Sequence, residues 1–260
     1  MPARLGDRHL TISRKTVLEG GRKFGQPSNV TDMNPFLSHY CERAGLAGLF
    51  VEPLNVVTNA AFLIAAILVW RRLASDPCLS PRREWDIAAL AGVVFAIGLG
   101  SAAWHAHPVT VTHLADVVPI SMFILGFILA FMIRIAGLAW PWALAVAGVF
   151  LAASYGAPPL LSIRPLGGSG AYLPALVAMA LVCAGMFALR HRLARIMLLA
   201  LVLFSVSLGL RSVDGDLCAV LPTGTHFLWH MLNASVLYTL LRLLIASAQE
   251  DRAPAAGLRP

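Results

Sequence analysis

Histidine recurs at helical spacing in two apolar stretches of this chain. Two imidazoles lie four residues apart in Thr-His226-Phe-Leu-Trp-His230. A hydroxyl and an imidazole lie at the same interval in Gly-Ser101-Ala-Ala-Trp-His105. Residues four apart in a helix share one face, so each pair points in one direction. A third apolar stretch contributes a carboxylate, Asp116. Titratable groups in apolar segments are costly, so these five side chains form a candidate functional site.

Three neutral imidazoles indicate a metal site. His105, His226 and His230 would leave a fourth coordination position open, which is the pattern of catalytic zinc, whereas a structural site is closed by a fourth protein ligand. Each residue alone has an ordinary explanation: an interfacial histidine often contacts a headgroup, Ser101 can bond its own helix, and Asp116 can favour a helix N-terminus. Heme ligation by paired histidines is a further alternative, but it explains neither Ser101 nor Asp116.

The composition places these residues in a membrane protein. Of 260 residues, 58% are hydrophobic and 13% are charged, about half of the roughly 25% charged residues in a typical soluble chain. So few charges cannot cover a water-facing surface, which excludes an ordinary soluble enzyme. The net charge is +7, but the basic residues fall in tails and short connections, which argues against nucleic-acid binding.

Seven apolar stretches approach the roughly 20 residues that a bilayer crossing requires. They are Pro53–Trp70, Trp85–Trp104, Leu114–Leu138, Trp140–Tyr155, Ala171–Leu189, Ala194–Leu210 and Thr225–Ala246, of which the fourth is the shortest. A spanning segment must satisfy its own backbone hydrogen bonds. We therefore predict an all-α polytopic membrane protein, a seven-transmembrane helix bundle.

Arginine distribution predicts the orientation. Arginines gather in alternate connections and after the last span, whereas the other connections hold only Arg164 and Arg211. The positive-inside rule then places the C-terminus in the cytoplasm and the segment before Pro53 outside. On this topology the second span ends, and the third and seventh begin, on the outer side. The five candidate side chains can therefore converge there.

The ends of the chain differ from its middle. Residues 1–32 are polar and basic without an apolar core, so they are not a secretory signal. We expect a disordered extension, or a true start at Met33, followed by one domain over residues 33–248 and a disordered cytoplasmic tail over residues 249–260.

The four cysteines divide by location. Cys41 and Cys218 both fall outside on the predicted topology, where disulfides persist, so we predict that they are bonded; two free thiols are the alternative. Cys78 lies in the arginine-rich inner connection and should stay reduced. Cys183 is mid-span and should pack as a small apolar residue.

The remaining histidines and two acids receive plainer interpretations. His107 and His113 flank a loop proline, and His191 lies among arginines on the inner surface. Asp214 and Asp216 precede Cys218 and are interpreted as solvated loop carboxylates.

The motifs together resemble the signature of the alkaline ceramidases, within a wider seven-span superfamily that includes adiponectin-receptor and hemolysin III-type proteins. The resemblance lies in Ser-x-x-x-His, Asp-x-x-Pro and His-x-x-x-His, matched in order by Ser101, His105, Asp116, Pro119, His226 and His230. The ceramidase N-terminal motif is also similar to a part of this chain, Tyr40-Cys41-Glu42 followed by Glu52-Pro-Leu-Asn55. This similarity favours the ceramidase branch over the receptors. The resemblance covers residues 33–246.

The resemblance implies a hydrolase that cleaves the amide of ceramide or a related N-acyl lipid entering from the bilayer. Zn²⁺ would be held by the three histidines and would activate water. Asp116 would take a proton from that water and return it to the leaving amine. Ser101 would steady the zinc site or donate to the oxyanion. The alternatives are a non-catalytic receptor or hemolysin III-like protein with structural zinc, and a heme-binding bundle.

Two further features follow from the resemblance. The family shows a bridge comparable to Cys41–Cys218. Animal members also hold Ca²⁺ before the first span, and Glu42 and Glu52 match two of the acidic positions. Ca²⁺ takes about six to eight oxygens, and other positions of that site are replaced here, by His39 and Ala44. We therefore do not expect Ca²⁺ at Glu42 and Glu52.

Overall fold

The computed structural model describes residues 40–43, 49–160 and 169–252, with only the backbone of 157–160. These residues belong to one unit, Phe36–Pro260, and contain helices but no strand, as predicted. The helices are α1 (Pro53–Thr58), α2 (Ala60–Ser75), α3 (Trp85–Ala106), α4 (Thr110–Arg134), α5 (Trp140–Leu160), α6 (Leu173–Ala188), α7 (Ala194–Leu217) and α8 (His226–Arg252).

Six helical segments are long and apolar enough to cross a membrane. They are Pro53–Ser75, Trp85–Ala106, Thr110–Arg134, Ser169–Ala188, Ala194–Leu217 and His226–Arg252. The fourth predicted span, Trp140–Tyr155, corresponds to a shorter apolar helix, Trp140–Gly156, within α5. Because a crossing takes about 20 residues, the described residues support six spans and leave the predicted seven-span bundle unconfirmed.

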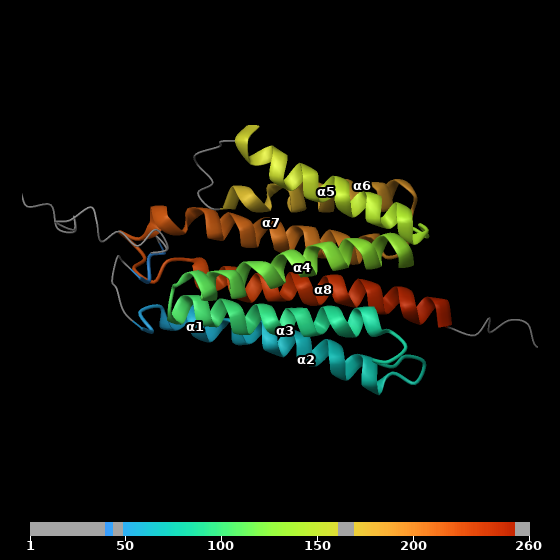
Figure 1. The fold of residues 1–260 in the computed structure, drawn as a ribbon, viewed down its shortest axis with the longest axis horizontal. Helices are drawn as coiled ribbons and strands as arrows, with labels where there is room; N and C mark the ends of the chain where they lie inside the picture. Colours follow the sequence, from blue (N-terminus) through green and yellow to red (C-terminus); the bar gives the residue numbers. More distant parts are fainter. Residues whose placement is uncertain (1–39, 44–48, 161–168, 253–260) are drawn as a thin grey trace, which may run out of the picture. The chain divides into compact units, whose positions relative to one another are not determined.

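Helix α8 lies in the middle of the bundle (Figure 1). It packs against α1, α2, α3, α4 and α7, whereas α5 packs against α4 and α6. Three of its leucines, Leu241, Leu243 and Leu244, are fully buried. Burial of such side chains stabilises the fold by about 1.5–3 kcal/mol each. The helix that carries two of the candidate histidines is therefore firmly anchored in the core.

Gly100 allows α3 and α4 to approach closely. A Cβ atom at this position would lie 1.9 Å from the backbone oxygen of Ala115, which is far inside van der Waals contact, so only glycine fits here. The next residue along α3 is Ser101 and the next along α4 is Asp116. The close approach thus places two of the candidate residues side by side.

A network of ion pairs joins α3, α4 and α8 at the end of the bundle where α3 begins. The buried Glu84 lies 2.9 Å from Arg134 and 2.8 Å from Arg252. Helix α8 continues to Arg252, so residues 249–252 of the predicted tail are helical. The remaining tail, the extension over residues 1–32 and Met33 lie outside the described residues.

Candidate metal centre

Three imidazoles meet at the end of the bundle where α3 ends and α8 begins. His105 comes from the last turn of α3, and His226 and His230 from the first two turns of α8. One ring nitrogen of each lies within 4.8 Å of the others, so modest side-chain rotation would bring all three around one ion. All three rings are buried. The predicted convergence of the histidines is confirmed.

Neighbouring groups orient two of these rings. The Nδ1 of His105 contacts the Glu52 carboxylate. The Nδ1 of His230 lies 3.1 Å from Thr58 Oγ1, whose hydroxyl donates to the Leu54 carbonyl at 2.7 Å and so accepts from the ring. Hydrogen bonds at Nδ1 leave the Nε2 lone pair of each ring free to bind a metal, the usual arrangement around metal-bound histidine.

His226 is the third ring. It stacks on Tyr40 with 3.8 Å between ring centroids. Its Nδ1 is buried without a hydrogen-bond partner among the described residues, and such an atom is costly unless a ligand satisfies it. Three buried imidazoles, one of which has an unsatisfied ring nitrogen, fit a divalent ion of the zinc type, for which imidazole is a preferred ligand.

Asp116 and Ser101 line the same cavity as the three imidazoles. Its volume is about 20 Å³, which exceeds the roughly 10–15 Å³ that one water requires. Ser101 is buried and hydrogen-bonds the Asp116 side chain. The structure therefore brings together all five residues that the sequence singled out.

Asp214 is not a solvated loop residue, and that prediction is wrong. It lies in α7, which continues beyond the predicted end of its span, and its side chain is buried. Its carboxylate accepts hydrogen bonds from the backbone amides of Cys41, Thr225 and His226. A carboxylate at the N-terminus of α8 satisfies free amides and favours the helix dipole. Asp214 thereby positions the first turn of α8.

Gly224 makes this arrangement possible. Its φ is +63°, and a Cβ atom there would lie 2.1 Å from Asp214 Oδ1. Only glycine adopts this backbone conformation without strain and leaves space for the carboxylate. The periodicity of α7 contained a signal for Asp214, since Phe204, Ser207 and Arg211 lead to it at intervals of three and four residues and so share a helical face with it.

The structure does not support a calcium site at Glu42 and Glu52. Glu42 accepts hydrogen bonds from the amides of Leu54 and Asn55 at the start of α1. Glu52 is fully buried and pairs with Arg43, itself 0% exposed. Burial alone would raise the pKa of Glu52, but hydrogen bonds with His105, Asn55 and Arg43 outweigh it and lower that pKa. Glu52 therefore already has a cationic partner and serves to orient His105.

The predicted disulfide is confirmed. Cys41 and Cys218 are bonded and tie the N-terminal segment to the end of α7. Cys78 is free and exposed, and Cys183 is free and buried.

The other histidines in the described part of the chain lie outside the cluster. His107 is exposed, and His113 packs against Trp104 with 4.9 Å between ring centroids. His191 accepts a hydrogen bond from the Leu193 amide at the opposite end of the bundle.

Comparison with models of known protein families and with curated proteins finds no match for this chain. The function proposed below therefore depends on the residues of the site and their geometry.

Proposed function

We propose that this protein is a metal-dependent membrane hydrolase of the alkaline-ceramidase type, cleaving the amide of ceramide or a related N-acyl lipid. One observation carries the proposal: the cavity that holds the histidines, Asp116 and Ser101 shares lining residues with a larger apolar pocket. The shared residues are Ile97, Ile120, Tyr172 and Asn233. Polar groups suited to hydrolysis thus adjoin a place for an acyl chain.

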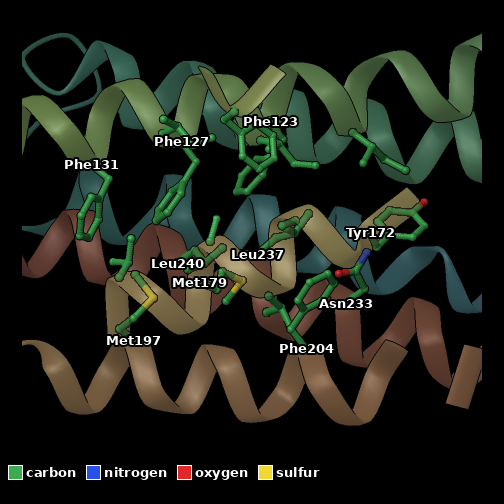
Figure 2. A pocket seen from close by; sticks show the side chains of 18 of the residues that line it. Phe123, Phe127, Phe131, Tyr172, Met179, Met197, Phe204, Asn233, Leu237 and Leu240 are labelled. Atoms are coloured by element: carbon green, nitrogen blue, oxygen red, sulfur yellow. The ribbon is translucent and has the colours of Figure 1, made fainter. Parts of the chain in front are cut away.

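The apolar pocket has a volume of about 110 Å³. It runs from Tyr172 and Asn233, beside the polar cavity, toward Phe131 and Met197 (Figure 2). Each buried methylene contributes about 0.8 kcal/mol to binding, so an acyl chain would be held firmly. A second pocket of about 220 Å³ between α4, α5 and α6 shares Ile120, Ile124 and Phe150 with the first and offers lipid a route from the bilayer.

The roles of the residues follow from their chemistry. His105, His226 and His230 would hold a divalent ion such as Zn²⁺, which would supply Lewis acidity when bound. Asp116 takes the proton of the attacking water and returns it to the leaving nitrogen. Ser101 holds Asp116 in place. The net reaction adds one water across the C–N bond and yields a fatty acid and an amine.

Metal analysis coupled to a hydrolysis assay on one detergent-purified sample tests this function. We expect about one Zn²⁺ per chain, release of fatty acid from ceramide or another N-acyl lipid, loss of activity with a zinc chelator and recovery when Zn²⁺ is returned. Metal without hydrolysis of any N-acyl lipid would favour the non-catalytic receptor type. Absorption in the heme bands would favour the heme-binding alternative.

We further propose that the metal centre lies at the outer side of the membrane and that the C-terminus is cytoplasmic, on the arginine distribution. Cys78 provides the test, because it is exposed in the connection between α2 and α3. A membrane-impermeant maleimide should label it in inside-out vesicles but not in intact cells. Cys78→Ser should abolish the labelling. Labelling of Cys78 in intact cells would contradict the proposed orientation and indicate the opposite one.

A further inference from the structure

Arg211 is a cation inside a membrane-spanning helix. It belongs to α7 and lines the same polar cavity as the histidines and Asp116. Charged side chains within spans are costly and are retained mainly for function. Arg211 lies just beyond the predicted end of its span at Leu210, so it was interpreted as a connection residue and not as part of the site.

The groups in direct contact with this guanidinium are neutral. Its nitrogens donate to Ser169 Oγ at 3.1 Å and to Tyr40 Oη at 3.4 Å. Its Cζ lies 5.4 Å from the ring centroid of Tyr172 and 5.5 Å from that of Trp229. A phenol has an ordinary pKa of about 10, so Tyr40 is uncharged at neutral pH. These contacts hold the guanidinium in place without neutralising it.

Two carboxylates, Asp116 and Asp214, are near enough to attract Arg211 electrostatically, and each has hydrogen-bond partners of its own. Asp214 accepts from three backbone amides, and Asp116 is hydrogen-bonded to Ser101. Among the described residues, no carboxylate lies within ion-pair distance of Arg211, and its Nε has no hydrogen-bond partner. The guanidinium therefore has a free donor at Nε and no ion-pair partner among the described residues, so it can bind an anion.

Two other buried or partly buried arginines, unlike Arg211, form ion pairs. Arg43 pairs with Glu52, and Arg134 pairs with Glu84 and Asp86. Both of these arginines therefore have a carboxylate partner within the protein. Arg211 instead contacts the cavity in which the substrate's reacting group would lie.

We propose that Arg211 binds a carboxylate on the amine half of the substrate, so that the preferred substrates are N-acyl amino acids rather than neutral ceramides. The inference rests on the proposed hydrolase function. Arg211 lines the polar cavity but not the apolar pocket, so the group that meets it lies outside the acyl chain. A carboxylate matches one guanidinium in charge and bidentate geometry. A phosphate carries about −1.5 to −2 charges and three acceptor oxygens, more than this small cavity with one arginine can satisfy.

Two matched substrates test the inference. N-oleoylglycine and N-oleoylethanolamine share acyl chain and amide and differ in a carboxylate against a hydroxymethyl group. We expect wild-type kcat/KM to favour N-oleoylglycine by about 100-fold, the scale of a charge-assisted bidentate contact. Arg211→Gln should remove this preference by lowering kcat/KM for N-oleoylglycine far more than kcat/KM for N-oleoylethanolamine. Arg211→Lys should retain part of the preference because it keeps the charge.

Arg242→Gln is the matched control. Arg242 also contacts an aromatic ring, that of Tyr238, with its Cζ 6.0 Å from the ring centroid, but it does not line the cavity. This variant should keep the substrate preference. A binding measurement on chelator-treated protein provides a readout without turnover: N-oleoylglycine should bind more tightly than N-oleoylethanolamine to the wild type, and equally to Arg211→Gln.

Several outcomes would overturn the inference and leave the hydrolase function intact. One is equal use of both amides by the wild type. Another is an equal loss of both in Arg211→Gln, which would assign Arg211 to the shared amide. A third is an effect confined to inhibition by free oleate, which would assign it to the fatty-acid product. If the metal-loaded wild type cleaves no amide, the proposed function fails, and the binding measurement still decides whether Arg211 recognises a carboxylate.

Discussion

His230→Ala is expected to lose the bound metal and the hydrolytic activity together. His230 contributes one of three imidazoles whose donor atoms lie within 4.8 Å of one another, and two histidines alone hold Zn²⁺ poorly. Loss of a residue that merely supports a metal ligand typically costs about 10–100-fold in affinity, so loss of the ligand itself should cost more. Metal per chain, measured by mass spectrometry after gel filtration in detergent, checks the result.

His107→Ala is the control for this variant. His107 lies two residues beyond His105 but is exposed and outside the cluster, so its replacement should leave metal content and activity unchanged. Thermal unfolding of both variants in the presence of chelator separates metal loss from misfolding. A His230→Ala protein that retains stoichiometric metal and wild-type turnover would remove His230 from the site.

Asp116→Asn should keep the metal and lose turnover. The amide has nearly the shape of the carboxylate, and its oxygen can still accept from Ser101, so the cavity should persist. It cannot take a proton from water, and a positioned general base contributes about 10²–10⁴-fold. We therefore expect kcat to fall by about 10³-fold with metal content unchanged, measured on the same preparation.

The control here is Asp216→Asn, at an exposed acid near the end of α7. It should hydrolyse lipid amides at the wild-type rate. If Asp116→Asn does the same, Asp116 is not the base. If Asp116→Asn loses its metal, Asp116 acts as a ligand and not in proton transfer.

Much of the site could be predicted because it depends on local periodicity. A four-residue interval sets His226 and His230 on one helical face whatever surrounds them. The alternation of spans then sets the depth of each helix end, which brought His105 and Asp116 to the same level. The Cys41–Cys218 bond followed from the same topology.

The sequence could not assign partners that depend on how separate helices pack. Glu52 resembled a cation ligand until the fold placed Arg43 against it. Asp214 and Arg211 were interpreted as connection residues because the end of α7 was predicted too early, at Leu210 rather than Leu217. The length of the fourth span could not be predicted from composition either, since apolar character alone does not determine where a helix ends.

The sequence by itself determined that this is an all-helical, membrane-type chain with histidines, a carboxylate and a hydroxyl at one end of its helices, because hydropathy and helical period are properties of neighbouring residues. The tertiary structure decided which of those groups share one cavity and which charges remain without a counter-ion. Those facts depend on close approaches such as that of Gly100 to Ala115 and on the turn at Gly224, which bring together atoms far apart along the chain.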